Sequence, residues 1–484
     1  MASTDRSTAR ADVAIIGAGL SGSCIARQLS AYELDTVLLE KECDVSLGVS
    51  RANSGIVHGG FHHNLKYLKS RLEIRGNLMY DRLQRELDFP FKRCGILVVA
   101  LNDEEMKYID HLYTQGLENG AIGIEMCSRE RMFELEPKLN SDCVGGLHAP
   151  GGGVLEPYRF VFSVVESAKK NGVEVYTNFE VERAERANEH YTIHAADGRT
   201  VEARYVINAA GLHADRVSSI FGAEEFTITP RKGEYYLLDR ATEAAPQRVL
   251  FPVPTKVSKG MLVIPTVEGT VLIGPTAEEI EDKEDLSTNA DQLGQILDQA
   301  RKMVPKVSQT DVITAFSGLR PAAAGDGDFY IDISKKAPNF IQVAGIQSPG
   351  LTAAPAIGEY VKDLLKKAGC SLSEKSDYDP FISKLPRIRD VGPYEADELV
   401  ASNPAYGNVV CRCEEISEAE IVEAIRRGHT TLDGVKYFTR AGMGRCQGGF
   451  CSYKIIKLLI RETGMSYREI QKRGAGTELL QDAL

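Results

Sequence analysis

The sequence contains no tryptophan and no excess of basic residues. Its 57 Lys and Arg residues stand against 68 Asp and Glu residues, which gives a formal net charge of −11. This balance argues against nucleic-acid binding, because a surface that binds a duplex needs clustered Lys and Arg.

The sequence also lacks any apolar run close to the ~20 residues that a membrane-spanning helix requires. Its first ten residues, MASTDRSTAR, are polar and do not provide the apolar core of a signal peptide. We therefore expect a cytoplasmic protein, either free or peripherally bound at the inner face of the membrane.

Cysteine is too sparse for a disulfide-stabilised fold, with ten residues in a chain of 484. A hydrophobic content of 43% is ordinary for a globular protein, and the length predicts about three domains of ~150 residues each. Six cysteines are scattered, and we expect them to be reduced core or surface thiols: Cys24, Cys43, Cys94, Cys127, Cys143 and Cys370.

The first motif is a glycine turn between an apolar strand and a helix start, ADVAIIGAGLSGSCIARQL. Gly17 permits the tight turn, Gly19 lets the backbone approach a pyrophosphate, and Gly22 lets the helix pack on the strand. A second apolar strand, TVLLEK, ends at Glu40 and Lys41, where the carboxylate can accept hydrogen bonds from a ribose. The motif predicts a dinucleotide site, for either FAD or NAD, with the pyrophosphate at the helix N-terminus.

The second motif is a quartet of cysteines near the C-terminus, Cys411, Cys413, Cys446 and Cys451, spaced C-x-C and C-x-x-x-x-C. Zinc knuckles fit this spacing poorly, and a disulfide is disfavoured in a reducing compartment. Four thiolates in glycine-rich turns such as GMGRCQGGFC suit an iron–sulfur cluster, because turn N–H groups can point at sulfur. Around the quartet we expect short helices in SEAEIVEAIRRG, SYKIIKLLIRETG and SYREIQKRG, the first of them capped by Ser417 and Glu420.

The loop after the acidic strand, SLGVSRANSGIVHGGFHH, resembles a family of flavoproteins. This family contains D-amino-acid oxidase, L-2-hydroxyglutarate dehydrogenase and the FAD-dependent glycerol-3-phosphate dehydrogenases. The resemblance implies FAD as the cofactor. It places Ser50, Asn53 and Ser54 along the flavin and His58 near the reacting carbon.

Further segments extend this resemblance over nearly the whole chain. FEVERAER resembles the segment whose backbone, here near Val181, meets the adenine, and YVINAAGLHAD resembles the strand and turn that close on the cofactor. SGLRP provides Arg320, and VAGIQSPGLTAAPAIG resembles the segment beside the flavin ring. For the cofactor site, YVINAAGLHAD implies Ala209, Ala210 and Gly211, and VAGIQSPGLTAAPAIG implies Gly345, Ser348, Pro349, Gly350, Leu351 and Thr352.

Oxidation of an alcohol by a flavin needs a base for the hydroxyl proton and a cation for an anionic substrate group. His58 is the candidate base, although it could instead only hydrogen-bond the flavin or the backbone. Arg320 is the candidate clamp, with a structural ion pair as the alternative. Lys259 resembles a lysine that the glycerol-3-phosphate branch places near phosphate, and a solvated lysine at a strand end is its alternative. His62, His63 and His213 are less well placed.

The GMGRCQGGFC run resembles the bacterioferritin-associated-ferredoxin-like domain, which implies a 2Fe–2S cluster held by the four cysteines. The combination resembles the bacterial glycerol-3-phosphate dehydrogenases with a C-terminal ferredoxin-like domain. We therefore expect oxidation of sn-glycerol 3-phosphate to dihydroxyacetone phosphate, with electrons relayed through the cluster to a flavoprotein or quinone-linked partner. A 2-hydroxy-acid dehydrogenase, for example for L-2-hydroxyglutarate, and a non-catalytic electron-transfer subunit are the alternatives.

The expected fold class is α/β with three parts. These are a Rossmann-like FAD-binding domain, a substrate domain with an antiparallel sheet, and a small α-helical iron–sulfur domain. The predicted boundaries are 10–85, 150–225 and 310–370 for FAD binding, 86–149 and 226–309 for the substrate domain, 371–405 for a linker, and 406–484 for the iron–sulfur domain.

Overall fold

The computed structural model describes residues 8–254, 260–323 and 325–479. The chain divides into two compact units, one formed by residues up to Lys41 with Val45–Ile382, and one formed by Glu42–Asp44 with Ser383–Leu484. None of the helices in these described ranges has the length and apolar composition to cross a bilayer.

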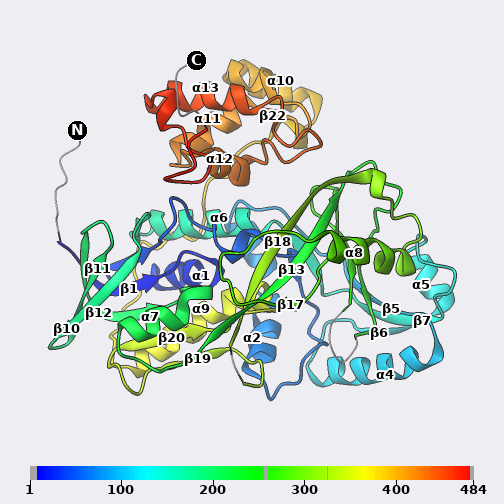
Figure 1. The fold of residues 1–484 in the computed structure, drawn as a ribbon, viewed down its shortest axis with the longest axis horizontal. Coiled ribbons are helices and arrows are strands. Elements are labelled where there is room, and N and C mark those ends of the chain that lie inside the picture. The colour runs from blue at the N-terminus through cyan, green and yellow to red at the C-terminus, as the bar shows by residue number, and fades with distance from the viewer. Residues whose placement is uncertain (1–7, 255–259, 324, 480–484) are drawn as a thin grey trace. The chain divides into compact units, whose positions relative to one another are not determined.

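The first unit contains a mixed sheet with β1 at its centre (Figure 1). Its strands are β1 (Thr8–Ile16), β2 (Thr36–Leu39), β9 (Glu174–Tyr176), β10 (Val181–Ala187), β11 (His190–Ala195), β12 (Thr200–Asn208), β19 (Tyr330–Ile333) and β20 (Phe340–Ala344). β1 lies parallel to both β2 and β12, and the antiparallel β10–β11 hairpin extends the edge at β12. Residues 13–16 of β1 are apolar and buried, as expected of a parallel strand covered on both faces.

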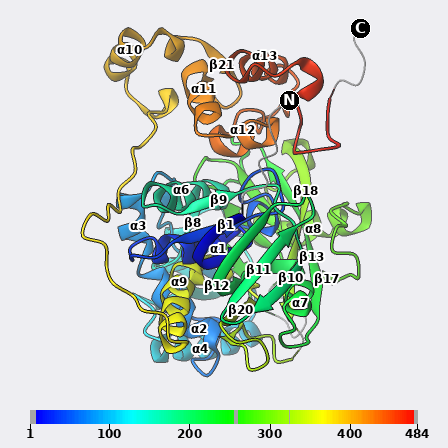
Figure 2. The ribbon, with the colours of Figure 1, turned by 90° about the vertical axis from the view of Figure 1, so that its left-hand side faces the viewer.

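Helices from distant parts of the sequence pack together beside this sheet. They are α1 (Leu20–Leu29), α2 (Leu68–Asn77), α3 (Tyr80–Glu86), α6 (Pro157–Lys170), α7 (Ala214–Ile220) and α9 (Gly350–Lys367). α1 packs against both α6 and α9 (Figure 2). A Cβ at Gly358 would lie 2.7 Å from the carbonyl oxygen of Cys24, so a glycine is needed for this approach of α9 to α1.

A second, larger sheet forms the other half of the first unit. Its strands are β5 (Ile96–Ala100), β6 (Glu125–Ser128), β7 (Gly145–Ala149), β13 (Ile228–Leu238), β14 (Val249–Pro252), β15 (Leu262–Pro265), β16 (Val271–Gly274), β17 (Glu278–Glu279) and β18 (Val312–Ala323). All of the pairings are antiparallel except β14 with β5. The strand β18 was expected within the FAD-binding segment 310–370, but it pairs along its whole length with β13 of this second sheet.

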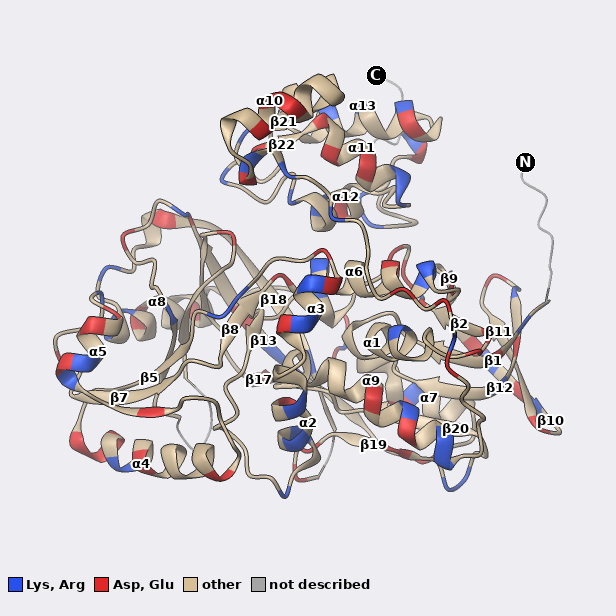
Figure 3. Cartoon of the chain, turned by 180° about the vertical axis from the view of Figure 1, so that it is seen from behind, with Lys and Arg blue, Asp and Glu red and all other residues tan. Residues whose placement is uncertain are grey.

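Three helices accompany the second sheet: α4 (Asp103–Glu118), α5 (Arg129–Leu135) and α8 (Ala290–Met303). The apolar face of α8, with Ile296, Leu297 and Ala300, packs into a buried cluster with strand residues such as Leu250 and Val263. Basic and acidic residues are interspersed along α5, whereas α4 carries mainly acidic residues (Figure 3). A small three-stranded sheet, β3 (Ile56–Val57), β8 (Gly153–Leu155) and β4 (Phe91–Lys92), also belongs to this unit.

The second unit is small and mainly helical. Its elements are α10 (Pro393–Ser402), β21 (Val409–Cys411), β22 (Ile416–Ser417), α11 (Glu418–Arg426), α12 (Leu432–Thr439) and α13 (Ser452–Thr463). The predicted capping box at the start of α11 is confirmed, because Ser417 and Glu420 each bond the other's backbone N–H. The segment SYREIQKRG was expected to be helical, but it forms only one 3₁₀ turn, Tyr467–Glu469, before the chain extends at Ile470.

The predicted linker, 371–405, runs to Ile382 in the first unit and includes α10 in the second. The two units together confirm the predicted fold class, an α/β protein with a largely antiparallel second sheet and a small helical C-terminal part. The 3₁₀ helices are η1 (Val49–Arg51), η2 (Gly211–His213), η3 (Gln309–Asp311), η4 (Ile388–Asp390), η5 (Pro404–Gly407) and η6 (Tyr467–Glu469).

Candidate functional site

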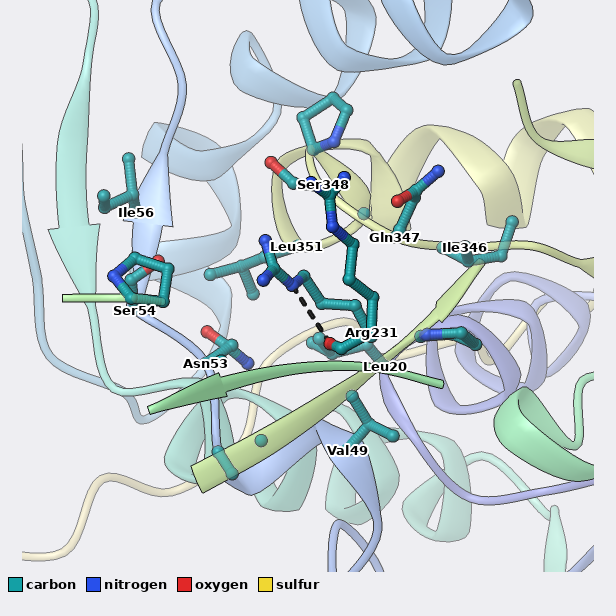
Figure 4. Close-up of a pocket in the computed structure, with 18 of the residues that line it drawn as sticks. Leu20, Val49, Asn53, Ser54, Ile56, Arg231, Ile346, Gln347, Ser348 and Leu351 are labelled. Carbon is teal, nitrogen blue, oxygen red and sulfur yellow. Dashed lines mark hydrogen bonds between the residues drawn. The ribbon is translucent and has the colours of Figure 1, made fainter. Parts of the chain in front are cut away.

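A cavity of about 520 Å³ opens in the first unit where the two sheets meet (Figure 4). Its lining comes from the β1–α1 turn, the segment 49–58, β13, β18 and the start of α9. None of the described residues that line it is Asp or Glu. The lining includes these predicted site residues: Gly19, Ser50, Asn53, Ser54, His58, Ala209, Gly211, Arg320, Ser348, Pro349, Gly350 and Leu351.

The glycine turn at one end of the cavity is too tightly packed for side chains. Gly17 has a φ of +102°, and a Cβ there would lie 2.5 Å from the carbonyl oxygen of Ala209. A Cβ at Gly22 would overlap the carbonyl oxygen of Gly17. Glu40 accepts a hydrogen bond from the backbone N–H of Ala18 over 2.7 Å, which ties the end of β2 to the turn. This cradle of bare backbone at a helix N-terminus fits the pyrophosphate of a dinucleotide.

The loop after β2 is held to this turn by side-chain hydrogen bonds. Ser50 accepts from the backbone N–H of Leu20 over 2.9 Å, and a Cβ at Gly19 would lie 2.9 Å from the same hydroxyl. Asn53 donates to the carbonyl of Ser50 and accepts from the N–H of Gly55, each over 2.8 Å. Ser50 and Asn53 therefore shape the loop along the cavity as well as line it.

His58 follows β3 and is buried beside the start of α9. Its backbone N–H donates to Oγ1 of Thr352 over 2.9 Å, and its carbonyl accepts from Nδ2 of Asn77 over 2.6 Å. Its Nε2 lies 3.3 Å from Oγ of Ser348, which also lines the cavity. The hydrogen bond to Thr352 thus fixes the backbone of His58, and Ser348 lies next to the imidazole inside the cavity.

Arg320 lies in β18 at the other side of the cavity. It donates to three backbone carbonyls: from Nη2 to Thr276 over 2.8 Å and to Lys232 over 3.5 Å, and from Nε to Arg231 over 3.3 Å. Among the described residues, no carboxylate forms an ion pair with it. Burial lowers the pKa of Arg320, with Tyr235 opposing and the charge of Arg231 adding to the effect. Neutral carbonyl oxygens therefore position the guanidinium, and its positive charge is available to an anionic ligand.

Arg231 lines the same cavity and was not singled out from the sequence. It stands opposite Arg320 in the β13–β18 register, and its side chain extends into the cavity in the direction of Ser348 (Figure 4). The alternation within TPRKGEYYLLD places Arg231, Gly233 and Tyr235 on one face of the strand, and all three line the cavity. The alternation of this strand, in which every second residue faces the cavity, was thus the sequence signal that could have identified Arg231.

Val181, Ala210 and Gly345 are predicted cofactor residues that do not line the cavity. Val181 packs in a core cluster with Leu39, the last residue of β2. Gly345 has a φ of +68°, and a Cβ there would lie 2.9 Å from Cβ of Ala323. Ala210 caps the 3₁₀ turn η2, at the carboxyl end of β12. Lys259 lies outside the described residues.

The three other histidines considered from the sequence, His62, His63 and His213, differ in their positions. His63 lines the cavity, and the His62 ring lies 5.3 Å from that of His58. Nε2 of His213 lies 3.3 Å from Nζ of Lys41, and burial, followed by the charge of Lys41, lowers the pKa of His213.

The four C-terminal cysteines come together in the second unit as two pairs. Cys411 hydrogen-bonds with Cys451, and Cys413 with Cys446. The first pair is buried, whereas the second is only half-buried. The hydrogen bond from Cys451 lowers the pKa of Cys411 to about 6 in spite of its burial.

Backbone N–H groups surround these sulfurs. Gly442 and Glu414 donate to Cys411, and Phe450 and Gly448 donate to Cys446. In the described part of the chain, no three His, Cys, Asp or Glu side chains gather as they would around one metal ion. Two thiol pairs with N–H donors fit a two-iron cluster, in which each iron takes two thiolates.

Comparison with known proteins agrees with both sites. The family model for FAD dependent oxidoreductase matches residues 12–364, and that for the BFD-like [2Fe-2S] binding domain matches residues 409–461. These matches confirm the predicted FAD and 2Fe–2S cofactors and the prediction of an oxidoreductase rather than a non-catalytic subunit.

The chain is similar to named proteins over most of its length. It is 43% identical to a glycerol 3-phosphate dehydrogenase of Caloramator mitchellensis, covering 97% of this chain and 98% of the relative. It is 31% identical to a glycerol 3-phosphate oxidase of Mycoplasma genitalium, covering 76% of this chain and 97% of the relative. Among solved structures, the dithionite-reduced L-alpha-glycerophosphate oxidase of Mycoplasma pneumoniae with FAD bound matches with a TM-score of 0.74 and 30% identity, covering 78% of this chain and 99% of the other.

Proposed function

This chain belongs to the FAD dependent oxidoreductase family, and we propose that it oxidises sn-glycerol 3-phosphate to dihydroxyacetone phosphate. The observation that carries the proposal is the cavity itself, where His58 and Arg320 stand in a lining whose described residues include no carboxylate. The names of the relatives from Caloramator mitchellensis and Mycoplasma genitalium support this substrate.

Bound in this cavity, FAD would supply the acceptor for the hydride, two electrons and a proton, from C2 of the substrate. His58 takes the proton of the C2 hydroxyl at its imidazole, because a neutral imidazole is a base of suitable strength near neutral pH. Its backbone bonds with Thr352 and Asn77 limit its movement. The hydroxyl of Ser348, 3.3 Å from Nε2, is placed to orient the ring or the substrate hydroxyl.

Arg320 binds the anionic end of the substrate. Its guanidinium has an anchored geometry, because three backbone carbonyls accept from it and Gly233 leaves room for it. A Cβ at Gly233 would lie 3.2 Å from Nη2 of Arg320. An anion bound there would hold the substrate between this arginine and His58, which orients the reacting carbon.

We further propose that electrons leave through the C-terminal unit to a redox partner. The 2Fe–2S cluster, when bound, carries one electron at a time. The pair Cys413 and Cys446 is only half-buried, so this edge of the site is accessible to a partner. A flavoprotein subunit or a quinone-linked subunit at the inner face of the membrane would serve as this partner.

Anaerobic reduction of the bound flavin tests the substrate directly. We expect sn-glycerol 3-phosphate to bleach the flavin absorption rapidly, and L-2-hydroxyglutarate to bleach it slowly at equal concentration. Rapid bleaching by the hydroxy acid without bleaching by sn-glycerol 3-phosphate would assign the cavity to 2-hydroxy acids instead.

A further inference from the structure

Two arginines face each other across adjacent strands at the substrate end of the cavity. Arg231 of β13 and Arg320 of β18 are register partners, and both line the cavity. Residues directly opposite in an antiparallel pair project from the same face of the sheet with their Cβ atoms ~5 Å apart. Two like charges in this arrangement repel each other, so an anion between them would relieve the repulsion.

The charge of the lining supports such an anion. The described lining contains the cations Lys69, Arg231 and Arg320 and no Asp or Glu, although the whole chain has a net charge of −11. Acidic and basic residues are interspersed elsewhere, for example along α5 (Figure 3). The cavity therefore concentrates one sign of charge in a protein whose balance has the other sign.

The neighbouring residue on the same strand shows how the alternation of β13 separates two cations. Lys232 is buried on the opposite face, and its Nζ lies 2.8 Å from Oδ2 of Asp285 and 3.1 Å from Oγ of Ser287. Lys232 therefore has a structural ion pair on the far face of the strand. Arg231 lines the cavity and extends in the direction of Ser348 (Figure 4).

We propose that Arg231 is a second anion-binding residue, which acts with Arg320 to select a phosphate monoester over a monocarboxylate. This inference rests on the proposed function, in which the anionic end of the substrate binds at Arg320. One guanidinium can donate two parallel N–H bonds, one to each oxygen of a carboxylate. A phosphate monoester has three outer oxygens and close to two charges, so it can accept from two forks at once. The substrate class is accordingly a short hydroxylated phosphate monoester.

The test compares Arg231→Gln and Arg231→Lys with wild type, all loaded with FAD. Arg183→Gln is the matched control, because Arg183 is an exposed residue of β10 that pairs with Glu185. Inorganic phosphate is the probe, and its dissociation constant is measured from the change in the flavin absorption spectrum. We expect Arg231→Gln to weaken phosphate binding by about 10- to 100-fold, the effect of one lost charge-assisted hydrogen bond. Arg231→Lys should give an intermediate loss.

A second probe separates selectivity from a general loss of the site. Acetate, a monocarboxylate, should bind to Arg231→Gln with the wild-type dissociation constant. With sn-glycerol 3-phosphate, the concentration for half-maximal flavin reduction should rise by about 10- to 100-fold while the limiting rate stays close to wild type.

The outcomes distinguish this inference from the proposed function. If sn-glycerol 3-phosphate does not bleach the wild-type flavin but Arg231→Gln weakens phosphate binding, the proposed substrate is wrong and the two-arginine site stands. If wild type is bleached and phosphate binds equally well to wild type, Arg231→Gln and Arg231→Lys, the inference about Arg231 is overturned. Equal losses of acetate and phosphate binding would also overturn it, because they would show no selectivity.

Discussion

Nε of Arg440 donates to Oε2 of Glu414 over 2.9 Å, and both side chains are buried. Glu414 directly follows Cys413, and Arg440 ends α12 with a φ of +73°, just before the loop that carries Cys446. Nη1 of Arg389 also lies 3.2 Å from Oε2 of Glu414. This ion pair links the two cysteine-bearing segments, and it accounts for a left-handed, buried arginine at the end of a helix.

We therefore expect Glu414→Gln to destabilise the second unit. Removing one partner of a buried ion pair leaves an uncompensated charge and costs about 3–5 kcal/mol. Denaturant unfolding followed by the visible circular dichroism of the cluster measures this loss. Glu398→Gln, on the exposed face of α10, is the control and should unfold like wild type. Equal unfolding midpoints for the two variants would contradict a role for the Glu414–Arg440 pair.

Replacing Cys411 or Cys446 by serine should abolish the visible absorption of the cluster. Each iron of such a cluster requires two thiolates, and each substitution removes one member of an observed pair. Flavin reduction by substrate should keep the wild-type rate, whereas electron transfer to the physiological acceptor should be lost. The matched control is Cys94→Ser in the first unit, which should retain the cluster. Wild-type electron transfer in Cys411→Ser would contradict the relay.

His58→Asn should slow flavin reduction by about 10²- to 10⁴-fold, the usual contribution of a general base. Bound FAD should remain, because the contacts of the backbone of His58 with Thr352 and Asn77 do not involve the imidazole. Stopped-flow absorption under anaerobic conditions measures the rate. His111→Asn, at an exposed position of α4, serves as the control. A wild-type rate in His58→Asn would leave His58 with only a structural role.

Gly22→Ala should prevent FAD binding, because the added Cβ would overlap the carbonyl oxygen of Gly17 in the phosphate cradle. Overpacking of this kind costs about 1–3 kcal/mol even where the backbone can move. The ratio of flavin to protein absorption after purification measures the effect. Gly294→Ala in α8 is the control, since its Cβ would enter open space and should stabilise the helix by ~1 kcal/mol. Full FAD occupancy in Gly22→Ala would show that the cradle tolerates a side chain.

The sites that the sequence predicts best are those whose chemistry is local. The strand–glycine–helix pattern around Gly17 and the cap at Ser417 each depend on residues within a few positions of one another. The 3₁₀ turn at Tyr467–Glu469 shows that even a local signal, here a capping box, does not always predict an α-helix. Its capping box is present, but a single turn does not bury enough apolar surface to continue as a helix.

The arrangement of residues at the substrate end of the cavity depends on contacts between strands that are distant in the sequence. Arg231 and Arg320 are separated by 89 positions in the sequence, and only the β13–β18 register brings them face to face. The same pairing moves β18 from the expected FAD-binding segment into the second sheet. A close approach of backbones requires glycine at 318, where a Cβ would overlap the carbonyl oxygen of Ala52. None of these relationships can be read from the neighbours of a residue in the chain.

The sequence by itself indicated a dinucleotide site and a cysteine-held metal centre, because the glycine turn and the cysteine quartet are short motifs. The resemblance of neighbouring segments to known families then implied FAD and a 2Fe–2S cluster. The tertiary structure decided how the four thiols pair and which cations share the cavity. Thiol pairing and strand register are long-range contacts, chosen by the burial of whole elements rather than by the residues that finally meet.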